Sequence, residues 1–489
     1  MLWKRSIPAV LAAATVVIPV AAPGPASAHI RSDTVTLSGP SPLAGCTAGP
    51  PTETVDVGTE LEPWLAVDPR HPRRMIAAWQ QDRRNFGNAN GIGLASTTDG
   101  GATWHNSVAP GFTKCSGGDQ DRTGSPWVSV GAGGVAYLSA GSFSRPGTSQ
   151  VLVARSTDLG GSWTGPVPVI TDDVASYWND KPSVTADPVD PRYVYVTWNR
   201  GQIPIAHHEI MLARSTDGGR SYEAPRAIYR PTPDGAGTFG SQIVRLPDGT
   251  LLDLFVEKAF PLGGPPVAVQ SKVRVMRSSD HGLTWSEPIT VTEQQINQPV
   301  LPDTGAVVPS PGINPDIAVD RRTGRVYVVW GQQGLSAANS DVALASSADG
   351  GRTWTAPVRV NRTPATANPR AGQAFLPQVE VTGDGTVGVT YYDFRADSPG
   401  PGTATDVWLA TCRGARCATG GDDWREGHLF GSFDIETALP WSGGPYIGSY
   451  VSLGHTWHSF VAAFTATTGT PGNRQDIFLV KAPAGPGLR

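Results

Sequence analysis

Short runs of apolar residues, many of them β-branched or aromatic, alternate along this chain with clusters of Gly, Pro and Asp. The stretch 182–229 is typical, because the segments 182–187, 193–198, 209–214 and 221–229 are separated by such clusters. This composition and spacing predict four successive β-strands joined by tight turns. Helical periodicity is confined to the N-terminus, so the pattern predicts an all-β protein.

A short phrase follows the third apolar run of five of these units. It reads Ser or Thr, any residue, Asp, any residue, Gly, two residues, and then Trp or Tyr. In such a phrase the Asp and Ser side chains bond backbone N–H groups across a tight turn. Gly supplies a positive φ, and the aromatic residue covers the turn. The aspartates are 59, 59, 63 and 69 residues apart, namely Asp99, Asp158, Asp217, Asp280 and Asp349.

A spacing in this range is the signature of a repeat architecture, in which each unit buries its apolar faces against its neighbours. Two further units, at 378–411 and 450–480, follow the order of strands without a good turn phrase. The sequence therefore predicts a β-propeller of four-stranded antiparallel blades, with seven blades favoured and six as the alternative. A β-sandwich would show turn signals without this period.

The two ends of the chain are expected to close the ring. The last unit has only three strands, and the early segment 34–38 (TVTLS) is available to supply its outer strand. Pairing the two would remove an exposed sheet edge. The predicted organisation is a signal peptide at 1–28, an N-terminal arm at 29–59 that contributes this closing strand, and a propeller at 60–489.

The first residues have the features of a secretory signal. Lys4 and Arg5 precede an apolar run at 7–22, and Ala26-Ser27-Ala28 forms a cleavage site, so cleavage is expected after Ala28. A transmembrane anchor is the alternative, but the run is short and ends at the cleavage site. The protein is expected to be secreted, extracellular and without an integral membrane segment.

The four cysteines suit an oxidising compartment. Cys412 and Cys417 are close in sequence and are expected to close a small loop. Cys46 is then left with Cys115, and that bond would tie the arm to the loop after the first unit. A metal site is the alternative, but no Cys-x-x-Cys spacing or histidine pairing supports it.

Chain direction decides where a ligand can bind. If every innermost strand begins at one face, called the top, then the turn phrases all lie at the bottom. Residues before the first strands and after the second strands then surround a central basin at the top. They combine carboxylates, arginines, amides and aromatic rings, which suits a sugar or another anionic ligand rich in hydroxyl groups. Among them are Glu62, Arg122 and Lys181. The alternative for any one of these residues is a solvated loop charge in an ion pair.

The turn phrases resemble the Asp boxes of sialidases and other BNR-repeat proteins, over essentially the whole mature chain. The segments 375–381 (FLPQVEV), 391–395 (YYDFR) and 446–453 (YIGSYVSL) resemble those of secreted bacterial sialidase-like BNR proteins. The resemblance implies a propeller with exo-α-sialidase-like glycoside hydrolase activity. In sialidases three arginines hold the substrate carboxylate, a glutamate activates a tyrosine nucleophile, and an aspartate is the acid/base. Where sialidases carry Arg-Ile-Pro, this sequence reads Glu62-Pro63-Trp64.

Carried over residue by residue, the resemblance implies Tyr450 as the nucleophile, Glu257 as its activating carboxylate and Asp121 as the acid/base. The arginines of the rim are expected to hold the substrate carboxylate, and other rim residues to complete the substrate-binding surface. The expected substrate-binding residues are Arg83, Arg84, Arg200, Arg395, Asp393, Asp180, Trp178 and Tyr446.

Two classes of function follow from these features. The first is an exported glycoside hydrolase acting on exo-linked acidic sugars, and the second is a non-catalytic propeller that binds glycans or protein partners. The rim residues differ from unit to unit, which favours one asymmetric site and therefore an enzyme. The net charge of −4 argues against nucleic acid as a partner. A glycan ligand, a monomer, and no cofactor or metal are expected.

Overall fold

The computed structural model describes residues 28–29, 34–203, 208–232, 236–259, 269–296, 298–309, 314–420 and 423–484. Over these residues the protein is all-β, without an α-helix and with three short 3-10 helices, η1 (Lys114–Ser116), η2 (Gly414–Ala418) and η4 (Ile435–Thr437). The predicted signal peptide lies outside the described residues, apart from Ala28. No helix in the described part of the chain is long and apolar enough to cross a membrane.

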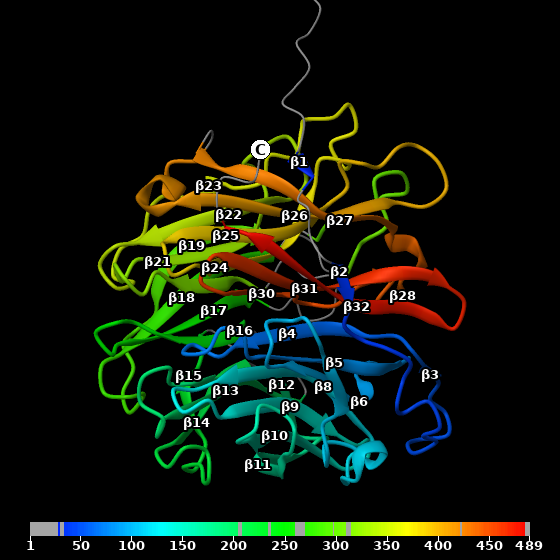
Figure 1. Cartoon of the computed structure of the whole chain (residues 1–489), viewed down its shortest axis with the longest axis vertical. Helices are drawn as coiled ribbons and strands as arrows, with labels where there is room; N and C mark the ends of the chain where they lie inside the picture. Colours follow the sequence, from blue (N-terminus) through cyan, green and yellow to red (C-terminus); the bar gives the residue numbers. More distant parts are fainter. Residues whose placement is uncertain are drawn as a thin grey trace, which may run out of the picture.

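Four-stranded antiparallel units follow one another around a common centre, in the order of the sequence colours (Figure 1). The first two units are β4 (Leu61–Val67), β5 (Met75–Arg84), β6 (Ala89–Thr97) and β7 (His105–Val108), then β8 (Arg122–Val130), β9 (Ala136–Phe143), β10 (Thr148–Ser156) and β11 (Thr164–Asp173). The next two are β12 (Tyr177–Ala186), β13 (Val194–Gln202), β14 (His208–Ser215) and β15 (Arg226–Tyr229), then β16 (Ala236–Arg245), β17 (Leu251–Ala259), β18 (Val269–Ser278) and β19 (Ile289–Ile296).

The remaining units repeat this order. They are β20 (Asp316–Val319), β21 (Val326–Gln332), β22 (Asp341–Ser347) and β23 (Val358–Arg359), then β24 (Ala374–Val381), β25 (Thr386–Asp393), β26 (Ala404–Arg413) and β27 (Arg425–Asp434). The last unit is β30 (Ser452–His455), β31 (Ser459–Thr470) and β32 (Asn473–Pro483), completed by β2 (Thr34–Thr36). Three pieces lie outside this scheme: β1 (Ala28–His29) beside β27, β3 (Val55–Asp56) beside β5, and the hairpin β28 (Leu439–Trp441) with β29 (Gly444–Tyr446).

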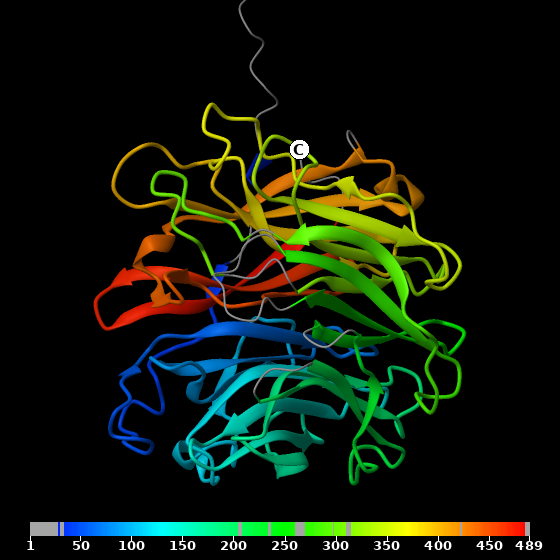
Figure 2. The same ribbon diagram turned by 180° about the vertical axis from the view of Figure 1, so that it is seen from behind.

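The innermost strands surround the centre of the molecule. Each of β4, β8, β12, β16, β20, β24 and β30 contacts the next, and β30 also contacts β4. The view from behind shows the same circular order of the sheets (Figure 2). This arrangement of radial sheets is that of a β-propeller, as the repeat predicted.

Burial within a unit follows the position of each strand. Every residue of the second strands β5 and β9 is buried, because both faces of these strands lie against neighbouring sheets. The outer strand β7 is largely exposed. Apolar residues from adjacent units form the core between them, as where Ile76 and Leu94 of the first unit pack with Val128 and Leu138 of the second.

The turn phrases form the predicted turns. In the second copy, Asp158 Oδ1 accepts hydrogen bonds from the Ser156 hydroxyl at 2.8 Å and the Ser162 amide at 2.8 Å. Gly160 has a φ of 91°, a conformation that favours glycine. Hydrogen bonds from Ser162 lower the pKa of Asp158 to about 2, so the turn keeps its charge-assisted bonds in mildly acidic solution. The aspartates are therefore occupied in building turns.

The N-terminal arm joins the last unit. Thr34, Val35 and Thr36 pair antiparallel with Val480, Leu479 and Phe478 of β32, which covers the outer edge of that sheet. Beyond this strand Leu37 is 1% exposed, and the Ser38 hydroxyl donates to Asp476 at 3.1 Å. The arm then crosses to the first unit.

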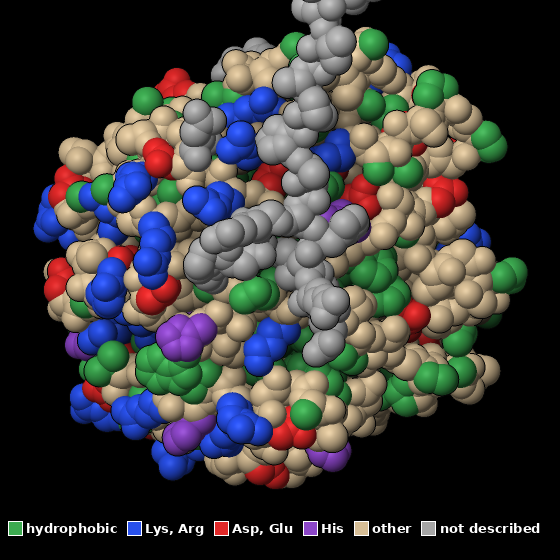
Figure 3. Space-filling view, turned by 45° about the horizontal axis from the view of Figure 1, so that its top comes forward, with side chains coloured by type: hydrophobic (Ala, Val, Ile, Leu, Met, Phe, Trp, Pro, Cys, Tyr) green, Lys and Arg blue, Asp and Glu red, His purple; other side chains and the backbone are tan. Residues whose placement is uncertain are grey.

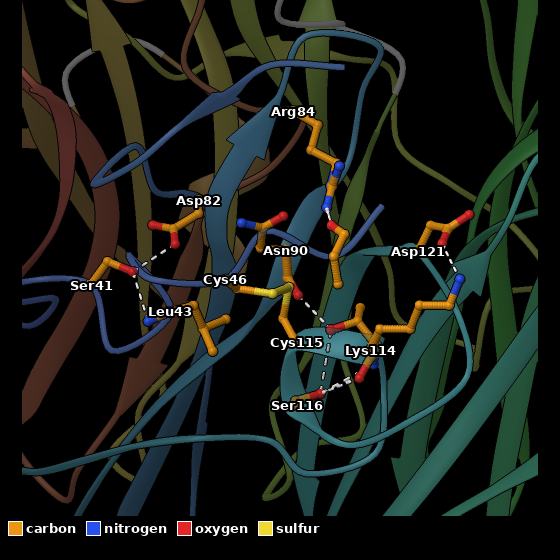
Figure 4. Close-up of a disulfide and its surroundings, with 12 residues drawn as sticks. Ser41, Leu43, Cys46, Asp82, Arg84, Asn90, Lys114, Cys115, Ser116 and Asp121 are labelled. Atoms are coloured by element: carbon orange, nitrogen blue, oxygen red, sulfur yellow. Dashed lines mark hydrogen bonds and ion pairs between the residues drawn. A yellow bond between two sulfur atoms is a disulfide. The ribbon is translucent and has the colours of Figure 1, made fainter. Parts of the chain in front are cut away.

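Both predicted disulfides are confirmed. Cys46 bonds Cys115 with an S–S distance of 2.07 Å, and Cys412 bonds Cys417. The first bond ties the arm to the η1 loop between the first and second units (Figure 4). No free cysteine remains among the described residues.

We expect the Cys46→Ser/Cys115→Ser variant to lose roughly 3–4 kcal/mol of unfolding free energy, because a long loop is no longer closed in the unfolded chain. The two cysteines are 69 residues apart, whereas Cys412 and Cys417 are only 5 apart. The matched Cys412→Ser/Cys417→Ser variant should therefore lose less. Urea unfolding of both variants measures the difference, and equal losses would contradict the loop-length argument.

Candidate functional site at the channel mouth

A bulge at the top of the innermost strands aims side chains at the central channel. The strand register shifts between Leu61 and Trp64 in β4 and between Asp180 and Ser183 in β12. Glu62 and Lys181 stand in these bulges with φ values of 56° and 50°. A left-handed conformation costs a non-glycine residue about 1–3 kcal/mol and persists only where the surroundings impose it. Ser125 in β8 and Leu376 in β24 repeat the geometry at 53° and 51°.

Glu62 is the centre of a polar cluster at the mouth of the channel. Its Oε1 lies 2.9 Å from Lys181 Nζ and accepts hydrogen bonds from the Tyr446 hydroxyl at 2.8 Å and the Ser449 amide at 3.2 Å. Its Oε2 accepts from Gln80 Nε2 at 2.5 Å. The first unit, the third unit and the segment that leads into the last unit thus meet on one carboxylate that is 1% exposed. We call Glu62, Lys181, Tyr446 and Arg83 the channel-mouth cluster.

Electrostatics keeps Glu62 ionised. Burial alone would raise the pKa of this carboxyl group, but the charges of Lys181 and Arg83 and the hydrogen bonds from Lys181 and Tyr446 outweigh it and lower the pKa to about 2. The pKa of Tyr446 is raised, because the phenol is buried and stands beside the Glu62 charge. In the free protein the tyrosine therefore stays protonated and donates to a carboxylate.

Arg83 completes the cluster without an ion pair to any carboxylate in the described part of the chain. Its guanidinium lies 5.2 Å from the ring centre of Trp441 and 5.4 Å from that of Tyr446, and Nη1 donates to Gln80 at 2.6 Å. The side chain is 4% exposed, and Nε has no hydrogen-bond partner. A buried cation of this kind is balanced at longer range by Glu62, and it can accept an anionic partner.

The channel below the cluster is filled by side chains. Trp64 and Trp127 stack with ring centres 3.3 Å apart, and Tyr450 packs against both. A cavity of about 20 Å³ remains there, lined by residues that lie in or just before the innermost strands. This volume holds about one water molecule. A sugar therefore does not fit inside the channel.

The predicted contact between Tyr450 and Glu257 is not formed. The Tyr450 hydroxyl donates to the Pro126 carbonyl at 2.9 Å, and burial raises the pKa of this phenol well above its usual value. Glu257 instead accepts hydrogen bonds from Tyr229 and, at 2.7 Å, from Arg274. The correction has a simple cause: Glu257 lies beside the outer strand of the third unit, whereas Tyr450 lies in the channel wall.

We expect Tyr450→Phe to leave any glycosidase activity within about threefold of wild type, since only one neutral hydrogen bond is lost. The stability loss should be about 1 kcal/mol for the same reason. Steady-state kinetics and thermal unfolding of this variant check both values. A large loss of turnover in a folded variant would restore Tyr450 as a candidate nucleophile.

Asp121, the predicted acid/base, and three of the four predicted arginines are engaged in separate ion pairs. Asp121 is 2.6 Å from Lys114 Nζ. The arginines do not converge on one vacant position, because each already has a carboxylate of its own. These pairs are Arg84 with Glu53, Arg200 with Asp172, and Arg395 with Asp393 and Glu426.

The remaining predicted residues divide between the cluster and its surroundings. Tyr446 belongs to the cluster. Asp180 is half-buried beside it and accepts the Lys181 amide at 2.8 Å. Trp178 lies on the top face, where Arg145 covers its ring at 4.7 Å and Phe143 packs at 4.4 Å. Asp393 is buried under Arg395.

The sequence placed Glu62 and Lys181 on the rim but assigned them no role. A signal was present, because Glu62-Pro63, Ser125-Pro126 and Lys181-Pro182 stand at equivalent points of three units. Proline lacks the N–H that a strand ladder needs and is found in sheets at bulges, so it suits these positions. The described residues contain no group of three or more His, Cys, Asp or Glu arranged to hold a metal ion.

Comparisons with known proteins give distant likenesses. No family model matches the chain. A Paenibacillus xyloglucanase is 26% identical over 312 residues, which span 59% of this chain and 26% of that protein. The chain thus covers about a quarter of the length of this curated relative.

Solved structures with a similar fold include glycosidases. A Hadza microbial sialidase is 16% identical, with a TM-score of 0.44 and coverage of 88% of this chain and 66% of the other. The α-L-arabinofuranosidase of Fusarium graminearum is 11% identical, with a TM-score of 0.47 and coverage of 95% and 99%. At these identities and TM-scores none of the three relatives assigns a substrate or a catalytic residue to this chain.

Proposed function

We propose that the protein is an exported glycoside hydrolase that acts on glycans carrying an acidic sugar, with its active site at the channel mouth. The observation that carries the proposal is the 2.8 Å hydrogen bond from the Tyr446 hydroxyl to Glu62, flanked by Lys181 and Arg83. A tyrosine next to a carboxylate is a nucleophile with its base, and two cations beside them suit a substrate carboxylate.

The chemistry follows from this arrangement. Tyr446 Oη transfers its proton to Glu62 Oε1 as the oxygen attacks the anomeric carbon, and the bond from that carbon to the leaving oxygen breaks. Asp180, half-buried beside Lys181, is the acid that protonates the leaving oxygen. Water then attacks the anomeric carbon of the tyrosyl glycoside, Asp180 takes the proton of the water, and Glu62 returns its proton to the departing Tyr446 oxygen. This assignment replaces the sequence-based choice of Tyr450, Glu257 and Asp121.

The low pKa of Glu62 means that a bound substrate must make this carboxylate more basic before it can accept the proton of Tyr446. In the free protein Glu62 is a weak base, because Lys181 and Arg83 stabilise its charge. A substrate carboxylate bound by the same two cations would compete for them and raise the basicity of Glu62 when it is needed. Acidic sugars would therefore be turned over, whereas neutral sugars would leave Tyr446 protonated.

The proposal also includes the number of blades, the cellular location and the oligomeric state. The closed series of contacts from β4 through β30 and back to β4 supports a closed seven-bladed ring. The disulfides support an oxidising, extracellular location after removal of the predicted signal peptide. A monomer remains the expected state.

A non-catalytic glycan-binding propeller is the second candidate. It is favoured by the ion pairs of Arg84, Arg200 and Arg395, because arginines with carboxylate partners leave fewer groups free for a substrate. In that case the channel-mouth cluster binds a sugar carboxylate without reacting. A measurement of glycoside turnover therefore distinguishes the two candidate functions.

The test is a panel of fluorogenic glycosides that includes a sialoside and a glucuronide. We expect turnover of at least one acidic glycoside, and a loss of about 10²-fold or more in kcat for Tyr446→Phe and Glu62→Gln. Tyr450→Phe, also a channel tyrosine, is the matched control. Binding of acidic sugars by the wild type without hydrolysis of any glycoside would establish the second candidate instead.

A further inference from the structure

Two buried arginines from adjacent units share one carboxylate that comes from the N-terminal arm. Arg84, at the end of β5, has Nη1 3.3 Å from Glu53 Oε2, and Arg122, at the start of β8, pairs with Glu53 Oε1. The arginine side chains are 2% and 4% exposed. A guanidinium stays protonated in a protein, so two such cations require a carboxylate at this point.

Positive charge exceeds negative charge around this pair. Lys114 and Asp121 form their own ion pair beside Arg84, and Arg145 is close enough to Arg122 to act on its charge. Four cations therefore face two carboxylates, those of Glu53 and Asp121. The Nε atoms of Arg84 and Arg122 have no hydrogen-bond partner in the described structure. The junction retains donors and charge for an anion.

The segment that carries Glu53 covers the arginines without a hydrophobic anchor. No apolar residue of the segment 44–58 is buried, whereas the Glu53 side chain itself is 7% exposed. The segment is held by the Cys46–Cys115 disulfide, by a hydrogen bond from Arg84 Nη2 to the Ala48 carbonyl at 2.5 Å, and by the pairing of β3 with β5. Figure 4 shows Arg84 pointing from β5 towards the loop of Lys114 and Cys115.

The backbone passes unusually close to the guanidinium. Gly49 has a φ of 120°, and a Cβ at this position would stand 2.5 Å from Arg84 Nη1. Any other residue would push the segment away from the arginine. The glycine and the glutamate four positions later together bring a backbone carbonyl and a carboxylate onto the same cation, as a bound acidic ligand would.

We propose that Arg84 and Arg122 form a carboxylate-binding site for an acidic sugar, which Glu53 of the arm fills in the absence of ligand. This site lies on the other side of β5 from the channel-mouth cluster, because Arg83 and Arg84 are consecutive in β5 and consecutive strand residues point to opposite sides. The segment 44–58 is then a cover that a carboxylate-bearing ligand displaces. This proposal concerns binding and does not depend on catalytic activity.

The test removes the internal carboxylate and offers one from solution. Glu53→Ala is unfolded thermally in sodium acetate and in sodium chloride at the same concentration, next to wild type. We expect acetate to raise the Tm of the variant by about 2 °C relative to chloride, because it binds only the folded state, and to leave wild type unchanged. Glu53→Ala/Arg84→Gln should lose this response. A folded Glu53→Ala whose Tm is the same in both salts would overturn the proposal.

A second measurement covers the case in which Glu53→Ala does not fold, and also identifies the ligand class. Cys46→Ser/Cys115→Ser keeps Glu53 but loosens the cover. Calorimetric titration with glucuronate, with glucose as the neutral control, should show about tenfold tighter glucuronate binding than in wild type. Equal affinities for glucuronate in the two proteins, or equal gains for glucose and glucuronate, would show that the arm covers no carboxylate site.

Discussion

A chain that begins at residue 41 is expected to unfold with a free energy about 3–5 kcal/mol below that of a chain that begins at residue 29, because the last unit loses its outer strand. The deletion removes the pairing of β2 with β32 and the burial of Leu37, which is 1% exposed. It also removes the Ser38 hydroxyl, which accepts the Ile477 amide at 2.9 Å. The arm beyond residue 40, with its disulfide, stays in place.

Chemical denaturation of the chains that begin at residue 41 and at residue 29 measures this loss. Leu37→Ala separates the two contributions, since it removes the buried side chain but keeps the strand, and should cost about 2–3 kcal/mol. The freed edge of β32 should also make the deleted chain more prone to self-association, which size-exclusion chromatography detects. Unfolding midpoints that coincide for all three proteins would contradict a closing role for the arm.

Replacing Asp253 by Asn is expected to stabilise the protein at neutral and mildly alkaline pH by about 3–5 kcal/mol. Asp253 lies in β17 with no exposed surface, and burial raises the pKa of its carboxyl group to about 8. Its Oδ1 accepts from the Ser241 hydroxyl at 2.8 Å, but Oδ2 has no partner. Asn keeps the acceptor for Ser241 and carries no charge at any pH.

The sign of the pH dependence follows from the direction of this shift. In the unfolded chain the carboxyl group releases its proton near its ordinary pKa of about 4, while in the folded protein it holds the proton up to about pH 8. The contribution of Asp253 to stability is therefore fully present below about pH 4 and is lost as the pH rises towards 8. The advantage of the Asn variant should grow across this window.

Thermal unfolding of wild type and Asp253→Asn from pH 4 to pH 8 tests this dependence. Asp248→Asn is the matched control, because Asp248 is exposed at the turn before β17 and a backbone bond from Thr250 lowers its pKa. That variant should show a small effect of opposite sign. A constant difference between wild type and Asp253→Asn at all pH values would mean that the carboxyl group is ionised in the folded state.

The sequence predicted the units of this fold because each unit is specified by neighbours in the chain. The turn around Asp158 is built from Ser156, Gly160 and Ser162, all within a stretch of seven residues, so the phrase contains all its own partners. The pairing of the cysteines also followed from local information, since Cys412 and Cys417 are close in sequence and only two cysteines remain. The segment 34–38 was assigned as a closing strand because the last unit has only three strands of its own.

The candidate site could be predicted only in part. Arg83 and Tyr446 were named from their places after a second strand and before a first strand, and both belong to the channel-mouth cluster. Glu257 met the same positional rule, yet its partner is Tyr229 of the neighbouring unit. The rule identifies the face on which a residue lies, but not which of several side chains on that face it reaches.

What the sequence by itself determined is therefore the repeat, the disulfides, the closing strand and the face that carries the polar rim. Only the tertiary structure decided the pairs: Glu62 with Lys181 and Tyr446, and Glu53 with Arg84 and Arg122. The physical reason is that strands and turns form from contacts a few residues apart. The ion pairs join units separated by tens to hundreds of residues, and bulges and glycines of the folded backbone set their geometry.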